Sequence, residues 1–216
     1  MIKVENIDVY GFESAIRGMR NPLNSWVKSD SIFCQGDDGS SVCIGDNDLK
    51  LMQNLRKAGS DHRKYLRMIN VTMDITAPLY WWKEYDTYKV GTVANSCSTM
   101  HRITQKSFEI SDFSYEHLMP ASMRELNEII AILNAYLAEY LRGKENHEDP
   151  AVLKEFWWQL IQILPSSYNQ RRTVQLNYEV LLNMYHARKD HKLDEWREFC
   201  KVIESLPYFK EICLNE

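Results

Sequence analysis

The chain has 216 residues, of which 44% are hydrophobic and 26% are charged, which is ordinary for a globular domain with a substantial core. This composition excludes a disordered chain, a collagen and a coiled coil. The 30 Asp and Glu residues outnumber the 26 Lys and Arg residues, so the net charge is −4. A domain that holds duplex nucleic acid by its phosphates is excluded as well, because such domains are basic.

The sequence gives no clear signal for a membrane, an export route or a metal. No apolar run approaches the roughly 20 residues of a membrane-spanning helix, and residues 1–12 mix charge among apolar residues, so we expect a cytoplasmic protein. The 5 cysteines are widely spaced and form no CxxC pair, which predicts reduced, mostly buried thiols. His186 and His191 would lie on different faces of a helix, so we expect no metal site.

The first half of the chain predicts strands and helices in turn. Residues 2–10 alternate loosely between apolar and polar side chains, which predicts a strand, and a helix is expected over 12–19. Asn21-Pro22 ends that helix. Residues 34–48 are so rich in Gly, Asp and Ser that they predict a surface loop.

A second helix is expected over 49–58, and residues 68–75 have the β-branched alternation of a strand. The Ala77-Pro78 step then starts an aromatic-rich helix over 78–89, with proline in the first turn, where its missing N–H costs nothing. This passage from strand to helix is an α/β signature.

The second half predicts helices. Residues 122–125 form a capping box, and apolar residues follow at helical spacing until Gly143. Asp149-Pro150 starts another helix, which ends before Pro165. Two further helices are expected over 177–188 and 193–203.

Residues 142–150 predict a solvated, charged connector that is too short to link separate domains. The order of elements therefore predicts an α/β (α+β) protein, with a central mixed sheet and a helical C-terminal half. We expect it to be a single domain over residues 1–216.

Common cofactor-binding and catalytic motifs are absent from the sequence. The chain has no GxGxxG after a strand, no GxxxxGK[ST], no HExxH and no GxSxG. Polar residues gather instead in residues 59–67 and in a second group: Gln170, Arg171, Arg172, Asn177, Asn183 and Arg188. The arginine pair is either a solvated helix end or an anion clamp, because a guanidinium fork matches phosphate oxygens.

The order of these elements resembles a known family. Residues 74–102 (DITAPLYWWKEYDTYKVGTVANSCSTMHR) resemble the core of the flavin-dependent thymidylate synthases. That family has a strand, an Ala-Pro step, a helix, and an Arg-His-Arg motif followed seven residues later by serine. Residues 164–188 (LPSSYNQRRTVQLNYEVLLNMYHAR) resemble its C-terminal segment without a gap. The resemblance covers most of residues 12–205.

The chain lacks the Arg-His-Arg motif that is characteristic of this family. Counted without gaps from Ala77-Pro78, its three basic positions hold Thr87, Tyr88 and Lys89, and Cys97 stands in place of the serine. Charge is also reversed at two positions, where Glu179 replaces an arginine and Arg67 replaces a glutamate. We therefore expect weak FAD binding and low thymidylate synthase activity.

The resemblance implies a homotetramer that holds FAD and deoxyuridine monophosphate between subunits, with reduced nicotinamide and methylene-folate as co-substrates if it is active. The candidate catalytic residues are Cys97 and Arg188. The candidate substrate-binding residues are Ser25, Ser96, Ser98, Arg171 and Arg188. The candidate cofactor-binding residues are His62, Tyr88, Lys89, Asn177 and Asn183.

Three functions remain open from the sequence. The first is one-carbon transfer to a pyrimidine deoxynucleotide with FAD. The second is a non-catalytic flavin-binding or nucleotide-binding relative, and the third is an enzyme that modifies a different pyrimidine nucleotide. Cys97 likewise has two interpretations, because a thiol is either a nucleophile for the pyrimidine ring or a small buried hydrophobic residue.

Overall fold

The computed structural model describes residues 1–36 and 39–215, which fold into two compact units. The first unit holds Met1–Lys3, Thr76–Tyr85 and Asn95–Arg172. The second unit holds the described residues of Val4–Ile75, Asp86–Ala94 and Thr173–Glu216. The expectation of a single domain over residues 1–216 stays a prediction.

A four-stranded sheet has the strand order β1-β4-β6-β5. Its strands are β1 (Lys3–Tyr10), β4 (Asn70–Pro78), β5 (Val93–Ser96) and β6 (Asn169–Asn177). The α+β class is confirmed, but the sheet is antiparallel, so the expectation of a mixed sheet is wrong. The end of β4 meets the start of β6, where the amide of Leu79 donates to the carbonyl of Tyr168 at 3.0 Å. Strands that meet end to start in this way are antiparallel.

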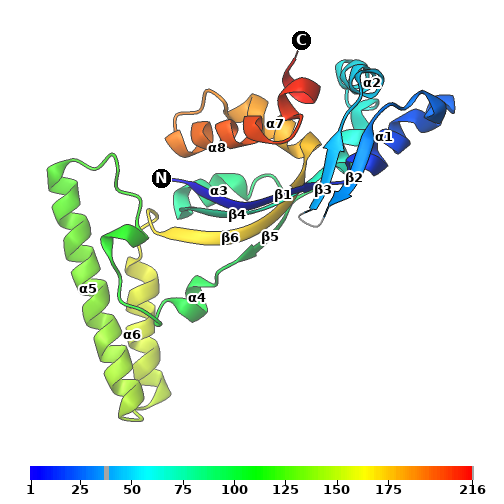
Figure 1. Cartoon of the computed structure of the whole chain (residues 1–216). Helices are drawn as coiled ribbons and strands as arrows, with labels where there is room; N and C mark the ends of the chain where they lie inside the picture. The colour runs from blue at the N-terminus through cyan, green and yellow to red at the C-terminus, as the bar shows by residue number, and fades with distance from the viewer. Residues whose placement is uncertain (37–38, 216) are drawn as a thin grey trace. The chain divides into compact units, whose positions relative to one another are not determined.

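In the second unit, two helices cover one face of the sheet, α7 (Tyr178–Arg188) and α8 (Asp194–Ser205) (Figure 1). Strand β4 alternates between buried and half-buried residues and turns Val71, Met73 and Ile75 into the core. The same unit contains α1 (Phe12–Arg20), α2 (Asp46–Lys57) and the 3₁₀ helix η3 (Arg63–Met68), which packs against α1, α2 and α7. These helices and strands confirm the predicted elements at 2–10, 12–19, 49–58, 68–75, 177–188 and 193–203 within a few residues.

The predicted surface loop over 34–48 is wrong for most of its length. Strand β2 (Ile32–Gly36) pairs antiparallel with β3 (Gly39–Cys43), and α2 begins at Asp46. The physical reason is that main-chain hydrogen bonding to a neighbouring strand overrides the low strand propensity of Gly and Ser. Residues 37–38, within the predicted loop, lie outside the described residues.

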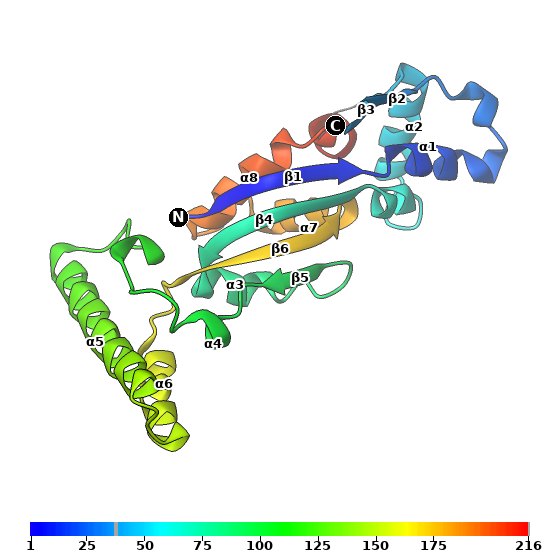
Figure 2. The same cartoon turned by 60° about the horizontal axis from the view of Figure 1, so that its bottom comes forward.

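In the first unit, α5 (Pro120–Glu145) and α6 (Pro150–Ile163) lie side by side as a helical hairpin (Figure 2). The hairpin buries leucines from both helices against phenylalanines of the preceding segment. The core residues are Ile103, Phe108, Phe113, Leu126, Leu133, Leu137 and Leu160. The unit also contains the short helices α3 (Leu79–Tyr85) and α4 (Thr99–Arg102).

Several predicted boundaries in the first unit need correction. Helix α5 begins after Met119 with Pro120 in its first turn, so the capping box at 122–125 does not form the helix start. The connector is 146–149 rather than 142–150, because α5 continues through Glu145. Asp149 caps α6 as expected, since its Oδ1 accepts from the amide of Ala151 at 2.8 Å.

The remaining segments are short. They are the 3₁₀ helices η1 (Asn21–Leu23), η2 (Trp26–Lys28) and η4 (Ile110–Asp112), and the π-helical turn η5 (Lys210–Leu214). Within residues 1–36 and 39–215, no helix is both long enough and apolar enough to cross a bilayer.

Candidate functional site

The structure places the predicted site residues in two groups. The first group lies in the first unit, where the segment 96–98 runs beside Arg171. The second group lies in the second unit around α7 and comprises His62, Tyr88, Lys89, Asn177, Asn183 and Arg188. Ser25 directly precedes η2, and its carbonyl accepts from Nη1 of the buried Arg20 at 3.2 Å.

Cys97 follows directly after β5 and is held on both sides of its backbone. Its amide donates to the carbonyl of Arg171 on β6 at 2.9 Å, and its carbonyl accepts from Nε2 of Gln170 at 3.0 Å. The same Nε2 donates to the hydroxyl of Thr99 at 3.1 Å. The thiol is exposed, so a fixed backbone presents a solvent-accessible sulfur.

The amide of Gln170 is itself fixed from the other side. Its Oε1 accepts from Nε of Arg172 at 2.9 Å, and the Arg172 guanidinium lies 4.1 Å from the centre of the Trp82 ring. The indole of Trp82 donates to the carbonyl of Gln170 at 2.9 Å. A buried tryptophan and a cation–π contact therefore orient the glutamine that holds Cys97.

The two serines beside Cys97 differ in what they do. Ser96 is exposed at the end of β5. Ser98 is half-buried and caps α4, because its hydroxyl accepts from the amide of His101 at 3.4 Å. The side chain of Arg171 is exposed on β6.

A cavity of about 320 Å³ opens beside Cys97 within the first unit. Its lining includes Tyr168, Arg102 and Lys106, and Lys106 forms an ion pair with Asp112 at 2.6 Å. Burial, and then the negative charges of Asp112 and Cys97, raise the pKa of Tyr168. Its phenol therefore stays protonated at neutral pH and can donate a hydrogen bond.

Sequence reasoning did not name Arg102, Gln105, Lys106 or Tyr168 as site residues. Residues 102–107, which are polar except for Ile103, were the signal for the first part of this lining. Tyr168 had no such signal, because its place depends on contacts with segments remote in sequence: its carbonyl accepts from the amide of Leu79, and it forms a β-bridge with Phe113.

In the second unit, Asn177 ends β6 directly before α7, and Asn183 lies within α7. Asn177 caps the helix, since its Oδ1 accepts from the amide of Val180 at 3.1 Å. A Cβ at Gly91 would lie 3.3 Å from Nδ2 of Asn177, so the 86–94 segment passes close to the start of α7. Asn183 is exposed, and its Oδ1 accepts from Nη2 of Arg63 at 3.4 Å.

Arg188 lies at the other end of α7 and has a dense set of partners. Its Nε donates to the hydroxyl of Tyr88 at 2.9 Å, and its Nη1 lies 2.9 Å from Nε2 of His191. The guanidinium also lies 4.8 Å from the centre of the Trp196 ring. Tyr88 thus holds Arg188 in place. Lys89, beside it, is exposed.

The reversed charges do not pair with one another. Glu179 is buried at 7% exposure, and its carboxylate lies 3.0 Å from Nε of Arg63. Arg67, the other reversed position, is exposed. His62 is also exposed, immediately before η3.

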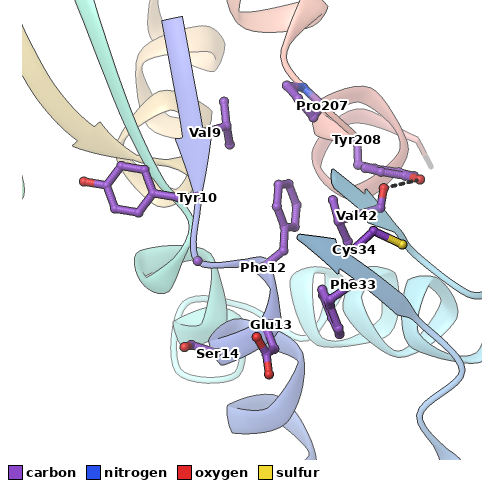
Figure 3. Close-up of a pocket in the computed structure, with 11 residues that line it drawn as sticks. Val9, Tyr10, Phe12, Glu13, Ser14, Phe33, Cys34, Val42, Pro207 and Tyr208 are labelled. Atoms are coloured by element: carbon purple, nitrogen blue, oxygen red, sulfur yellow. Dashed lines mark hydrogen bonds between the residues drawn. The ribbon is translucent and has the colours of Figure 1, made fainter. Parts of the chain in front are cut away.

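A second cavity, of about 520 Å³, lies in the second unit where β1 passes into α1 (Figure 3). Phe12, Phe33, Cys34 and Tyr208 contribute to its lining, and the hydroxyl of Tyr208 donates to the carbonyl of Val42 at 3.3 Å. None of the predicted site residues lines this cavity.

No protein-family model and no curated protein sequence matches the chain. Solved structures do match. Thymidylate synthase X (ThyX) from Helicobacter pylori with FAD and dUMP has a TM-score of 0.64 at 15% identity, covering 99% of this chain and 98% of that one. A second structure of Helicobacter pylori flavin-dependent thymidylate synthase ThyX, also with FAD and dUMP, has a TM-score of 0.62 at 16% identity, covering 98% of each chain.

A UMP/dUMP methylase, PolB from Streptomyces cacaoi bound with 5-Br UMP, has a TM-score of 0.57 at 13% identity, covering 95% of this chain and 88% of that one. The likeness extends over almost the whole chain in all three cases, while the sequence identity is low. The resemblance first read from residues 74–102 and 164–188 is therefore confirmed at the level of the fold: the chain has the fold of the flavin-dependent thymidylate synthases.

Proposed function

We propose that the chain binds a pyrimidine deoxynucleotide together with FAD and transfers a one-carbon unit to the pyrimidine ring. The observation that carries this proposal is the cavity of about 320 Å³ beside the fixed Cys97 in a chain of this fold. A volume of this size lies at the small end of the range for ligand pockets, which runs from about 300 to 1,000 Å³. Two solved structures with this fold contain dUMP or 5-Br UMP, which supports a pyrimidine nucleotide as the ligand.

The cavity offers the chemistry that a nucleoside monophosphate needs. Arg102 and Lys106 supply cations for a phosphate, and the protonated phenol of Tyr168 supplies a donor for a pyrimidine carbonyl. The thiol of Cys97 is accessible for attack on ring carbon C6, which would activate C5 as a nucleophile. In this role the side-chain amide of Gln170 and the carbonyl of Arg171 hold the backbone of Cys97 in place.

The second unit carries residues that suit FAD. Asn177 caps α7 and Asn183 lies within it. Exposed His62 directly precedes η3, which packs against α7, and exposed Lys89 lies on the segment that approaches Asn177. Arg63 adds a cation beside Asn183. Amides suit the hydrogen-bonding edge of a flavin, and cations suit its diphosphate. When bound and reduced, FAD would supply the hydride, with reduced nicotinamide and methylene-folate as the co-substrates of this proposal.

Release of tritium from C5 of the ring tests the transfer reaction. Purified protein would be incubated with FAD, reduced nicotinamide and methylene-folate, and with dUMP, UMP or dCMP labelled at C5. We expect slow release from one of these nucleotides, strongly reduced in Cys97→Ala. Cys34→Ala, which removes an exposed thiol in the other unit, is the matched control and should release tritium at the rate of the unaltered protein. Failure to release tritium from all three nucleotides contradicts a transferase.

A non-catalytic nucleotide-binding or flavin-binding relative is the second candidate. One observation favours it: the guanidinium of Arg188, a predicted catalytic and substrate-binding group, already contacts Tyr88, His191 and Trp196. Equilibrium binding of FAD and dUMP without tritium release would support this candidate. Release that depends on Cys97 would exclude it.

A further inference from the structure

Three cations of the second unit lie on segments that pack around one side of α7. Arg63 donates to Asn183 of α7, and His186 and Lys189 follow Asn183 at intervals of three residues, which places them along the same side of the helix. Arg56 lies at the end of α2, Arg63 begins η3, and Lys189 follows α7. Helix η3 packs against both α2 and α7, which brings these segments together. The cluster lies in a single compact unit and shares no residue with the cavity beside Cys97.

The cluster has more positive charge than its acidic partner neutralises. Glu179 contributes one negative charge to Arg63, at 3.0 Å, while Arg56 and Lys189 add two further positive charges. The Nε atom of Arg56 is buried, yet it forms no hydrogen bond with any described residue. A buried guanidinium N–H without an acceptor is costly, because it loses water and gains nothing in return.

His186 reports the positive potential of this cluster. Burial, followed by the charges of Lys189 from α7, Arg63 from η3 and Arg56 from α2, holds the pKa of His186 below its ordinary value. Glu179, also on α7, faces the cluster through its ion pair with Arg63. The imidazole is exposed, so a solvent anion can reach this region.

The chemistry favours an anion with several charged oxygens. Arg63 already donates to Glu179 and Asn183, and Nη2 of Arg56 donates to the carbonyl of Asn215. An anion would add acceptors for Nε of Arg56 and for the ammonium group of Lys189, which lie on different elements. A phosphate or diphosphate group has such acceptors and matches guanidinium geometry, whereas a carboxylate has two oxygens in one plane.

We propose that Arg56, Arg63 and Lys189 form an anion site that binds the phosphate or diphosphate group of a nucleotide. The inference extends the proposed function, because FAD is one source of such a group. Only the assignment of the diphosphate to FAD rests on the proposed function. The three cations would then replace charge that the motif positions 87–89 lack. The site itself would remain if the nucleotide were a different one.

Titration calorimetry with inorganic pyrophosphate and inorganic phosphate tests the site without any enzyme assay. We expect saturable pyrophosphate binding by the unaltered protein, weakened about fivefold or more in Lys189→Gln and in Arg56→Gln, since each loses a charge-assisted contact. Lys192→Gln removes an exposed lysine just beyond α7 and is the matched control, with unchanged affinity. Arg63 is left in place, because its removal would strand the buried Glu179.

The pKa of His186, followed by NMR and assigned with His186→Gln, gives a second readout. Bound pyrophosphate should raise that pKa, because the anion offsets the positive charges around the imidazole. Lys189→Gln should raise it in the absence of pyrophosphate. Absence of pyrophosphate binding, or equal affinity in Lys189→Gln, Arg56→Gln and Lys192→Gln, overturns the proposal.

Nucleotide probes distinguish the source of the phosphate. FAD and ADP carry a diphosphate, whereas FMN and dUMP carry a single phosphate. Sensitivity of FAD affinity to Lys189→Gln assigns the site to the flavin cofactor, and sensitivity of ADP affinity alone assigns it to another nucleotide. Pyrophosphate binding without tritium release from any pyrimidine nucleotide would remove the proposed transferase while leaving this site intact.

Discussion

At the residue scale, the contact between Tyr88 and Arg188 links the altered motif to α7. The hydrogen bond is 2.9 Å long and lies beside the Trp196 ring, where water has limited access. We expect Tyr88→Phe to lower the free energy of unfolding by about 1 to 3 kcal/mol, because a half-buried guanidinium loses an acceptor. Urea denaturation measures the change, and Tyr115→Phe, at a more exposed tyrosine, serves as a control.

The gap-free register of the motif has its own test. Thr87→Arg and Lys89→Arg introduce guanidinium groups at two exposed positions of the second unit. If this register is right, the double variant should bind FAD about tenfold more tightly, since guanidinium forks suit the diphosphate. Fluorescence titration of FAD measures the affinity, and an unchanged value would mean that the motif is aligned incorrectly.

The buried pair of Arg20 and Asp48 connects three segments of the second unit. Arg20 is 4% exposed, Asp48 is 0% exposed, and Nε of Arg20 lies 2.7 Å from Oδ1 of Asp48. The other oxygen of Asp48 accepts from the hydroxyls of Ser29 and Ser31, each at 2.7 Å. We expect Arg20→Met to destabilise the protein by about 3 to 5 kcal/mol, because it leaves a buried carboxylate without its cation.

The same pair predicts acid sensitivity. Burial raises the pKa of Asp48, but hydrogen bonds from Ser31, Ser29 and Arg20 outweigh it and hold the pKa below its ordinary value of 3.8. A lowered carboxyl pKa stabilises the fold at pH values above 3.8, and that contribution is lost as the pH falls through the folded-state pKa. Thermal unfolding between pH 6 and pH 2 should lose this contribution in the unaltered protein but not in Asp48→Asn.

At the element scale, Asn177 has two roles to separate. Its side chain caps α7 through the amide of Val180, and it is also a candidate for binding the flavin. Asn177→Asp keeps the cap, whereas Asn177→Ala should lose about 0.5 to 2 kcal/mol of stability. If both variants bind FAD more weakly but only Asn177→Ala loses stability, the amide binds the flavin independently of its role as a cap. Unchanged FAD affinity in Asn177→Asp would argue against a flavin contact by the amide.

Elements whose signals are local were predictable from the sequence. Asp149 marks the start of α6 through a cap to Ala151, and Asn177 marks the start of α7. Strands β5 and β6 were missed, because their pairing joins Cys97 to Arg171 across most of the first unit's sequence. Strand formation depends on packing against neighbouring strands, so the local sequence alone is a weak guide to β5 and β6.

In the candidate site, too, some residues could be predicted from the sequence and others could not. The resemblance pointed to Cys97 and Arg171, and the structure brings their backbones into contact. It gave no indication that Gln170 fixes Cys97, or that Tyr168 lines the cavity beside it. Those contacts arise from strand pairing and burial rather than from any spacing along the chain.

At the scale of the whole molecule, we propose the homotetramer that the resemblance implies. Helices α5 and α6 expose large apolar side chains, including Ile132 at 45%, Leu141 at 41% and Trp158 at 43%. Exposed apolar residues of this size are typical of subunit interfaces. Trp81, Trp82 and Trp196 instead lie in the cores of the units, so only part of the tryptophan content is available to an interface.

Sedimentation equilibrium tests this expectation. The unaltered protein should have the mass of four chains at micromolar concentration, and Trp158→Glu should reduce that mass, because a buried carboxylate opposes association. Val27→Glu, at a residue that is 94% exposed in the second unit, should leave the mass unchanged. A monomer in the unaltered protein would contradict the tetramer.

The central claim is that a pyrimidine nucleotide binds in the cavity beside Cys97, and titration calorimetry with dUMP in the presence of FAD tests it most directly. We expect saturable binding that weakens about tenfold in Arg102→Gln, which loses a phosphate contact, while Arg124→Gln on α5 binds like the unaltered protein. Absence of dUMP binding, or equal affinity in Arg102→Gln and Arg124→Gln, would contradict the account.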